Sequence, residues 1–242
     1  MLELKHVSVR FGGHMAVNDA SFDVPAGTIT GLIGPNGAGK TTIFNVITGL
    51  QALTRGTVVL DGQNITKKSA HARARLGIAR TFQRLELFGS LSVFDNVFTA
   101  AELNKVDGKN PREVTVALLE RMGLDEVASQ RADSLSTGNA RLLELARAMA
   151  CNPRVLLLDE PASGLDEVET DRFADTLRRL ADAGIGVLLV EHDVPLVMRL
   201  CSRITVLNFG SVLAEGTAQE IQSNKLVIDA YLGQGNDVGA TA

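Results

Sequence analysis

Gly34-Pro35-Asn36-Gly37-Ala38-Gly39-Lys40-Thr41-Thr42 follows an apolar stretch, residues 28–33, and precedes a helical pattern over residues 43–47. A strand, a glycine-rich turn and a helix with the spacing G-x-x-x-x-G-K-T predict a loop that binds a nucleoside triphosphate. The glycines let successive backbone N–H groups face phosphate oxygens, and the helix N-terminus adds partial positive charge. We expect Lys40 to reach the β- and γ-phosphates and the Thr41 hydroxyl to ligate Mg²⁺.

A second apolar strand, residues 155–158, ends in two acids, Asp159 and Glu160. Ligands of an open α/β sheet lie at the carboxyl ends of its strands, so Asp159 is expected beside Thr41 at the magnesium ion. Glu160 is then placed to take a proton from the attacking water as general base. Taken alone, the two acids are as easily explained as a solvated strand end. The phosphate loop favours their roles as magnesium ligand and general base.

A further anion-binding element is indicated by Leu135-Ser136-Thr137-Gly138-Asn139, which precedes a helical pattern over residues 140–150. Ser136 suits an N-cap, and Gly138 permits close approach of an anion to the helix start. Taken alone, this segment is more simply an ordinary capped helix. Because one nucleotide does not easily occupy two such sites in one chain, the second site is expected to serve a neighbouring subunit.

Composition narrows the classes of protein. The chain has 242 residues, of which 45% are hydrophobic, enough for one large α/β domain. A net charge of −4, the absence of Trp and a single Tyr argue against a nucleic-acid partner. Cys151 and Cys201 lack metal-ligand spacing and are expected to be buried free thiols. Neither a signal-peptide core nor an apolar run of roughly 18 residues occurs, so we expect a soluble, cytoplasmic protein that reaches a membrane only through a partner.

The order of patterns along the chain predicts one domain over residues 1–233, followed by a disordered tail at 234–242. Strands are expected within residues 2–33 and at 57–60, 155–158, 187–190, 204–207 and 212–214. Residues 69–150 read as mostly helical, with a helical subdomain at about 84–150. The helix after the phosphate loop is expected to reach about residue 50, with Ile43, Phe44, Ile47 and Leu50 on one face. A later helix, residues 168–183, is expected to end at Gly184.

Taken together, these segments resemble the ATP-binding subunit of an ATP-binding cassette (ABC) transporter, from residue 2 to about residue 233. The resemblance implies an α/β fold in which a phosphate-loop NTPase core carries an antiparallel β subdomain and a helical subdomain with the family signature, residues 135–139. It also matches Gln83 to the glutamine loop, Asp166 to the D-loop and His192 to the switch histidine. ATP and Mg²⁺ are the implied ligands.

The resemblance assigns roles residue by residue. Implied nucleotide contacts are Phe11, Gly34, Pro35, Asn36, Gly37, Ala38, Gly39, Lys40, Thr41 and Thr42, with Ser136, Gly138 and Asp166 acting across a dimer; implied magnesium contacts are Thr41, Gln83 and Asp159; implied catalytic residues are Glu160, His192 and Gln83. Phe11 offers a flat face to adenine, or else is a core residue at a strand end. His192 is suited to donate to the γ-phosphate.

Two departures from the family pattern concern the dimer contacts. The signature is commonly L-S-G-G-Q, whereas this chain has Thr137 and Asn139 at its third and fifth positions. The D-loop has Gly164 where alanine is usual. Ser136 and Gly138, which carry the γ-phosphate contact in the family, are retained, so the departures concern dimer closure and turnover rate.

Finer segments, including residues 79–83, 142–148 and 206–210, resemble the importers of branched-chain and other hydrophobic amino acids. Urea or amide importers and a lipopolysaccharide exporter are similar branches. The implied partners are membrane permease subunits, a second ATPase subunit and, indirectly, an extracytoplasmic solute-binding protein. The permease is expected in a groove near residues 83–88, where Leu85, Leu87 and Phe88 are either exposed or core residues. The implied location is peripheral, on the inner face of the cell membrane.

Other functions remain as alternatives. A soluble ABC ATPase of DNA repair would carry a long coiled coil between the glutamine loop and the signature, but only 53 positions separate Gln83 from Ser136. Translation types usually hold two cassettes in one chain. An adenylate-kinase-like protein or a GTPase gives no reason for the second anion site at Ser136 and Gly138.

Overall fold

The phosphate-loop sequence lies between a buried strand and a helix. The computed structural model describes residues 1–81, 83–104 and 108–232. The strand β3 (Ile29–Ile33) is buried along its whole length and pairs in parallel with strands on both sides. Apolar residues on both faces are expected of a central parallel strand that is covered by helices on each side. The helix α1 (Lys40–Thr48) begins directly after Gly39.

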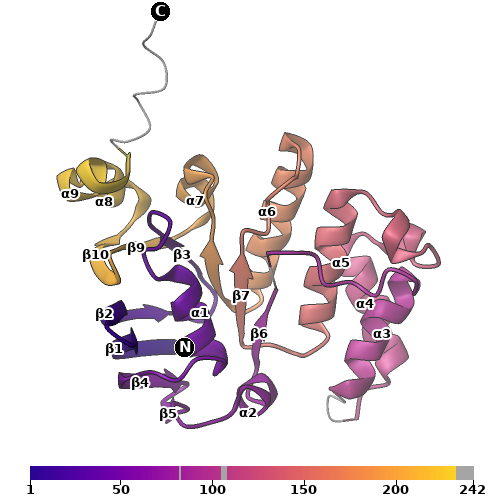
Figure 1. The fold of residues 1–242 in the computed structure, drawn as a ribbon. Coiled ribbons are helices and arrows are strands. Elements are labelled where there is room, and N and C mark those ends of the chain that lie inside the picture. The colour runs from indigo at the N-terminus through magenta and orange to yellow at the C-terminus, as the bar shows by residue number, and fades with distance from the viewer. Residues whose placement is uncertain (82, 105–107, 233–242) are drawn as a thin grey trace, which may run out of the picture.

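Two sheets are formed by the described residues (Figure 1). The larger, mostly parallel sheet has the strand order β10-β9-β3-β8-β7-β6, and the smaller, antiparallel sheet has the order β2-β1-β4-β5. Further bounds are β1 (Leu2–Phe11), β2 (His14–Val24), β4 (Arg55–Leu60), β5 (Gln63–Asn64), β6 (Ile78–Arg80), β7 (Val155–Asp159), β8 (Gly186–Val190), β9 (Arg203–Asn208) and β10 (Ser211–Gly216).

The strand β7 shows how the core is divided. Leu156 and Leu158 contribute to one buried cluster with the helices, whereas Val155 and Leu157 contribute to a second cluster that includes Phe44 and the antiparallel sheet. Because side chains of a strand alternate between its faces, one apolar run fills both layers. Asp159 and Glu160 therefore lie at the carboxyl end of a buried strand.

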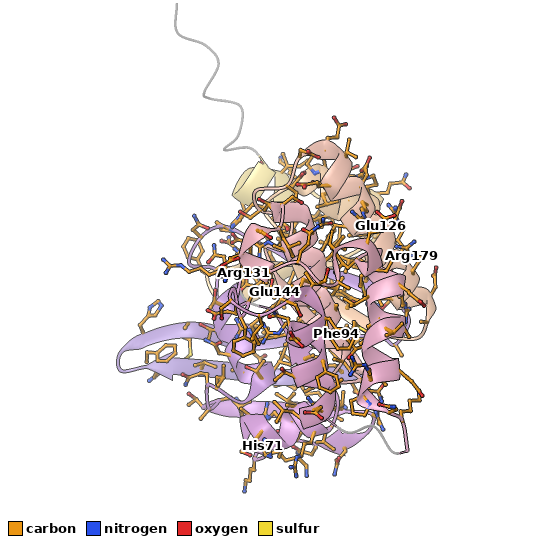
Figure 2. All side chains as sticks on the ribbon, turned by 90° about the vertical axis from the view of Figure 1, so that its right-hand side faces the viewer. His71, Phe94, Glu126, Arg131, Glu144 and Arg179 are labelled. Carbon is orange, nitrogen blue, oxygen red and sulfur yellow. The ribbon has the colours of Figure 1, made fainter. Side chains whose placement is uncertain are left out.

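Three helices, α3, α4 and α5, lie together beside the larger sheet, and Figure 2 looks onto this side, with Phe94 of α3 and Glu144 of α5 labelled. Their apolar faces join one buried cluster. The helical bounds are α2 (Ala70–Arg75), α3 (Val93–Leu103), α4 (Pro111–Met122), α5 (Thr137–Met149), α6 (Glu167–Asp182), α7 (Val194–Leu200), α8 (Ala218–Ser223) and α9 (Lys225–Val227), with short turns η1 (Asp125–Val127), η2 (Ala132–Ser134) and η3 (Ile228–Leu232).

One element prediction is wrong. Leu50 does not share the buried face of α1, because Gly49 adopts a left-handed conformation with φ 78° that ends the helix, and Leu50 is 61% exposed. The stretch predicted as mostly helical holds α2, α3, α4 and α5, but it also contains β6, a short strand that pairs in parallel with β7. A strand of three residues is too short for its alternation of side chains to be recognised in the sequence.

Other predictions have mixed outcomes. Both cysteines are free, but only Cys201 is buried, while Cys151 is half-buried after the end of α5. The buried face of α6 is confirmed, and Gly184 follows its last turn with φ 95°. The division into one domain, a helical subdomain and a tail stays a prediction, and residues 234–242 lie outside the described residues. In the part of the chain that the structure describes, no helix is long and apolar enough to cross a membrane.

Candidate nucleotide site

The phosphate loop lines the site in the structure. One pocket is bordered by loop residues 36–42 together with Phe11, His14, Asp159, Glu160 and His192. Gly39 has φ 106°, and a Cβ atom there would meet the backbone oxygen of Ala16 at 2.7 Å. A Cβ atom at Gly34 would meet the backbone oxygen of Leu207 at 2.2 Å. Glycine at these positions therefore lets the loop pack closely against neighbouring strands.

Lys40 is buried inside this loop. Its Nζ donates to the carbonyl oxygens of Gly34 at 2.6 Å and Pro35 at 3.0 Å. Burial lowers the pKa of Lys40, and the nearby carboxylates of Glu160 and Asp159 act in the opposite direction. The loop's own carbonyl groups thus hold the ammonium at the pocket, where a phosphate can meet it.

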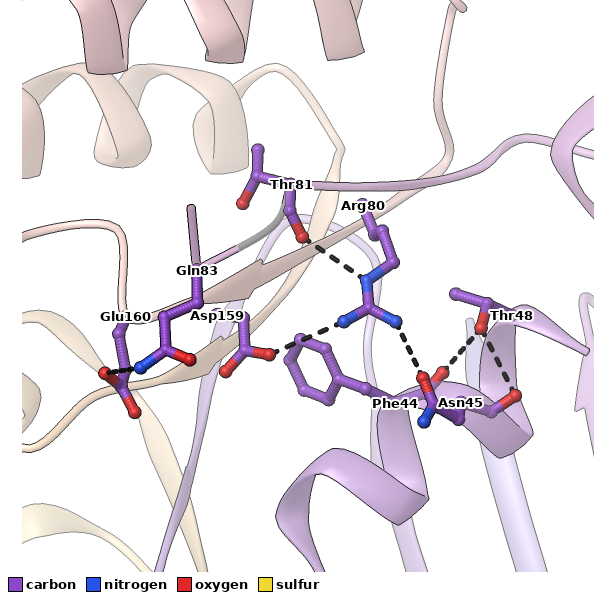
Figure 3. A network of polar contacts seen from close by, with 8 residues as sticks. All are labelled: Phe44, Asn45, Thr48, Arg80, Thr81, Gln83, Asp159 and Glu160. Atoms are coloured by element: carbon purple, nitrogen blue, oxygen red, sulfur yellow. Dashed lines mark hydrogen bonds and ion pairs between the residues drawn. The ribbon is translucent and has the colours of Figure 1, made fainter. Parts of the chain in front are cut away.

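Asp159 ends β7 at the same pocket. Burial raises the pKa of Asp159, while the charge of Arg80 lowers it. Arg80 stands at the end of β6, with Nη2 at 3.5 Å from Asp159 Oδ2 and Nη1 donating to Asn45 Oδ1 at 2.9 Å (Figure 3). The guanidinium therefore joins the acid of the central sheet to the helix that follows the phosphate loop.

Two residues of the predicted site contact Glu160. Gln83 Nε2 donates to Glu160 Oε2 at 2.8 Å (Figure 3), and His192 Nε2 lies 2.7 Å from Glu160 Oε1. Glu160 has φ 50°, a left-handed conformation that is strained for a residue with a side chain, and its N–H donates to Val190 O at 2.9 Å. Such strain is often found at functional sites, and Glu160 borders the pocket.

The signature residues lie elsewhere. Ser136 caps α5, and its Oγ accepts from the N–H of Asn139 at 3.3 Å. The Gly138 N–H donates to Glu169 Oε1 at 3.1 Å, and Asp166 caps α6. None of these residues borders the described pocket of the phosphate loop. The structure thus brings Asp159, Glu160 and His192 to the pocket of the loop, places Gln83 against Glu160, and leaves Ser136, Gly138 and Asp166 apart.

Phe11 and Phe88 are not core residues. Phe11 ends β1, is 49% exposed and borders the pocket, so a planar ligand can reach its ring. Phe88 and Leu85 are also exposed, whereas Leu87 packs against the core. The alternative that all three of Leu85, Leu87 and Phe88 are buried is therefore wrong.

Sequence reasoning missed several residues of the site. Glu191 is buried beside His192, and its carboxylate accepts from the N–H groups of Ala162 at 2.7 Å and His192 at 3.2 Å. Burial raises the pKa of Glu191. Arg80, Asn45 and Glu169 were also missed. An acid directly before the switch histidine was a possible signal for Glu191, but the other contacts join distant segments and leave no local pattern.

The oxygen donors of the pocket fit magnesium. No group of three or more His, Cys, Asp or Glu side chains able to hold a metal occurs among the described residues. Magnesium in nucleotide sites needs no such cage, since one or two protein oxygens and the substrate phosphates suffice. The hydroxyl of Thr41 and the carboxylate of Asp159, which border one pocket, are ligands of this hard-oxygen type.

Comparison with known proteins gives two family matches. The model "ABC transporter" matches residues 17–163, and the model "Branched-chain amino acid ATP-binding cassette transporter" matches residues 211–236. The high-affinity branched-chain amino acid transport ATP-binding proteins BraF of Pseudomonas aeruginosa and LivG of Escherichia coli are each 40% identical over 250 residues, covering 97% of this chain and 98% of the relative. The lipopolysaccharide export ATP-binding protein LptB of Escherichia coli is 35% identical, with 96% and 97% covered.

Solved structures agree with these matches. A nucleotide-free ATP-binding cassette from an ABC transporter superposes with a TM-score of 0.86 at 28% identity, covering 96% of this chain and 98% of that one. A dimeric ATP-binding cassette bound to ADP and phosphate has a TM-score of 0.79 at 26% identity, with 90% and 99% covered. The predicted fold class is thereby confirmed.

Proposed function

This chain belongs to the ATP-binding subunits of the ABC transporter family, and from that premise we propose that its ATP hydrolysis energises the import of branched-chain amino acids. Support for the substrate class comes from the names of the relatives BraF and LivG and from the second family model at residues 211–236. The lipopolysaccharide exporter is the second candidate, since LptB is 35% identical over 96% of the chain. The match at residues 211–236 favours import.

The proposed chemistry begins with binding. The N–H groups of the loop and Lys40 would hold the phosphates, and Phe11 would stack on adenine. Thr41, Asp159 and Gln83 would hold magnesium, which when bound neutralises charge on the phosphate oxygens. These assignments are supported by the common pocket of Thr41, Lys40 and Asp159.

Hydrolysis is assigned to the acid after the magnesium ligand. Glu160 would take a proton from water as the water oxygen bonds to the γ-phosphorus and the bond to the β–γ bridging oxygen breaks, giving ADP and phosphate. His192 would donate to the γ-phosphate, and Gln83 would orient the water. The observation that carries this assignment is the contact of Glu160 with both Gln83 and His192 beside the phosphate loop.

A second ATPase subunit is proposed to complete each site. Ser136, Gly138 and Asp166 would contact nucleotide bound by the partner, in a head-to-tail dimer that is homomeric or pairs with a similar subunit. Their position away from this chain's own phosphate-loop pocket supports the arrangement, as does the likeness to a dimeric cassette.

Membrane permease subunits are proposed to dock near residues 83–88, with a solute-binding protein acting indirectly and no nucleic acid involved. Leu85 and Phe88 are exposed there. A mostly apolar pocket nearby is bordered by Leu50, Ala148 and Cys151, among others, and also reaches Arg80. The chain would then act in the cytoplasm on the inner face of the cell membrane.

The assignment of Glu160 is tested by Glu160→Gln. The variant should bind ATP with unchanged affinity, lose nearly all hydrolysis and form an ATP-dependent dimer on size-exclusion chromatography. Glu113→Gln, an exposed change on α4, serves as the control and should hydrolyse ATP normally. Wild-type turnover by Glu160→Gln would refute the assignment. Reconstitution with permeases and a leucine-binding protein, compared with lipopolysaccharide export components, tests the substrate class.

A further inference from the structure

The signature helix α5 carries a buried arginine toward the glutamine loop. Arg141 is 6% exposed, and its Nη2 donates to the backbone oxygen of Gln83 at 3.1 Å. Its Nη1 donates to Glu144 Oε2 at 3.4 Å, and Glu144 is also buried. Figure 2 labels Glu144 on this helix. Burying two charges is costly, and a buried ion pair often stabilises a protein no more than apolar residues of similar size. Stability alone therefore does not account for this pair.

Gln83 extends this contact to the proposed base. Its backbone oxygen is held by Arg141, and its side-chain Nε2 donates to Glu160 at 2.8 Å (Figure 3). Glu160 in turn lies 2.7 Å from His192. A continuous set of hydrogen bonds therefore runs from α5 to the proposed base.

The loop is attached to α5 at more than one point. Arg147, also on α5, donates to the backbone oxygen of Glu86, and its guanidinium carbon lies 4.7 Å from the centre of the Phe88 ring. Before the loop, Thr81 N–H still donates to Leu157 O of β7 at 2.9 Å. Thr81 is thus attached to the central sheet and Gln83 to α5, so a displacement of α5 relative to β7 would move Gln83 relative to Glu160.

The other end of α5 is the signature. Ser136 caps the first turn of this helix, so one rigid element joins the signature to Arg141. We propose that Arg141 is a positioning residue that makes the placement of Gln83 and Glu160 depend on the position of the signature helix. Hydrolysis at this chain's nucleotide then responds to engagement of its signature with the partner's nucleotide. The inference rests on the proposed roles of Glu160, Gln83 and Ser136.

The main variant removes both buried charges. Arg141→Met with Glu144→Leu removes the buried ion pair as a unit, a change that is often tolerated. We expect an unchanged affinity for ATP, a turnover number lowered by about tenfold to a hundredfold, and loss of cooperativity between the two sites. Arg141→Lys keeps the charge but lacks the planar fork, and should give an intermediate loss.

A matched control is available on the same subdomain. Arg121 of α4 donates from Nη2 to the backbone oxygen of Arg179 at 3.1 Å, the same distance as the Arg141 contact. Arg121→Lys should retain both turnover and cooperativity, since its contact does not reach the glutamine loop. Tm and far-UV circular dichroism of every variant show whether it folds.

A fluorescence measurement separates positioning from a merely structural role. The chain has no Trp, so Leu85→Trp places a single emitter in the glutamine loop. In this background a non-hydrolysed ATP analogue should shift the Trp emission as the dimer forms. With Arg141→Met and Glu144→Leu added, the dimer should still form on size-exclusion chromatography but the emission shift should be lost.

The outcomes are distinguishable. Normal turnover and cooperativity in the double variant, or an unchanged Trp response, overturn the role of Arg141 while leaving the proposed function in place. Wild-type hydrolysis by Glu160→Gln instead removes the proposed function. If the double variant does not fold, Arg141→Lys decides the question, and its retention of full turnover and cooperativity would overturn the inference.

Discussion

Asp159 lies between two opposing influences on its protonation. Burial raises the pKa of this carboxyl group, and Arg80 is the largest of the influences that lower it. Arg80→Leu removes that positive charge, so the pKa of Asp159 should rise further. Because magnesium needs the carboxylate form, the acidic limb of the ATPase pH profile should move to higher pH. Arg80→Lys should give a smaller displacement.

The measurement is kcat/KM for ATP as a function of pH at a fixed magnesium concentration below saturation. Titration with magnesium at fixed pH should show, for Arg80→Leu, a higher half-saturating concentration that approaches the wild-type value as the pH rises. An acidic limb that stays in place would show that the Arg80 charge does not act on Asp159.

Residue roles were predictable where a local motif carries them. Lys40 and Glu160 follow from the loop spacing and from the end of an apolar strand, because each role depends on neighbours in the sequence. Arg80 was not predictable, since its partners Asn45 and Asp159 are 35 and 79 positions away in the chain. Such contacts follow from tertiary packing, on which a single sequence carries no direct information.

At the scale of the element, α1 depends on an arginine from the next helix. Arg73 of α2 is buried and donates to the carbonyl oxygens of Val46 at 2.6 Å and Ile47 at 2.9 Å, which end α1, and to Thr66 O at 2.7 Å. Val46 O also accepts from the N–H of Gly49 at 3.2 Å, so the loss of Arg73 removes the donor chiefly from Ile47 O and Thr66 O. Arg73→Leu should lower the free energy of unfolding by about 2–4 kcal/mol, because each buried polar group that is left unsatisfied costs about 1–3 kcal/mol.

Urea denaturation of the variant checks this value. Arg75→Leu, an exposed change on the same helix, is the control and should stay within about 0.5 kcal/mol of wild type. An equal stability of Arg73→Leu and Arg75→Leu would mean that water replaces the guanidinium at the end of α1.

The signature end of α5 gives a second element-scale prediction. Ser136→Arg places a long cation where the proposed partner nucleotide would lie, and it removes a cap worth about 1 kcal/mol. ATP binding to the separated subunit should persist, but the ATP-dependent dimer of Glu160→Gln should be lost. In mixed dimers, activity should return only at the site that pairs an intact phosphate loop with an intact Ser136. If mixing a Ser136→Arg chain with a chain altered in its phosphate loop restored activity equally for every distribution of the two changes, a head-to-tail dimer would be ruled out.

Elements were predicted well where their apolar period is long. The buried face of α6 runs through Phe173, Leu177 and Leu180, as a helical repeat requires. The end of α1 was placed too late because Leu50 continues the apolar period after Gly49 has already turned the chain. In that place, the backbone freedom of glycine outweighed the hydrophobic pattern.

At the scale of the whole molecule, the surface proposed for the second ATPase subunit and the surface proposed for the permease are joined through the central sheet. Glu160 follows β7, Arg80 ends β6 beside the apolar pocket, and the residues after β6 lead to Phe88. The sequence could indicate these surfaces only through the family resemblance, since an exposed apolar residue and a buried one look alike in a single chain. The structure separates them by exposure, which makes the docking surface testable.

Phe88→Asp tests the proposed docking of the permease. Phe88 is 49% exposed and contacts Arg147 of α5, so an aspartate there removes apolar contact area from the surface without opening a cavity in the core. ATPase stimulation by the membrane partner should fall severalfold, while the basal rate and Tm of the free subunit stay close to wild type. Val116→Asp, at a site on α4 that is 45% exposed, is the matched control and should keep full stimulation. Equal stimulation in both variants would place the permease elsewhere, and a lower Tm only in Phe88→Asp would show that the ring stabilises the glutamine loop instead. Because Arg147 and Arg141 hold the same loop, the double variant of Arg141 and Glu144 should also lose stimulation, and should do so together with its basal cooperativity.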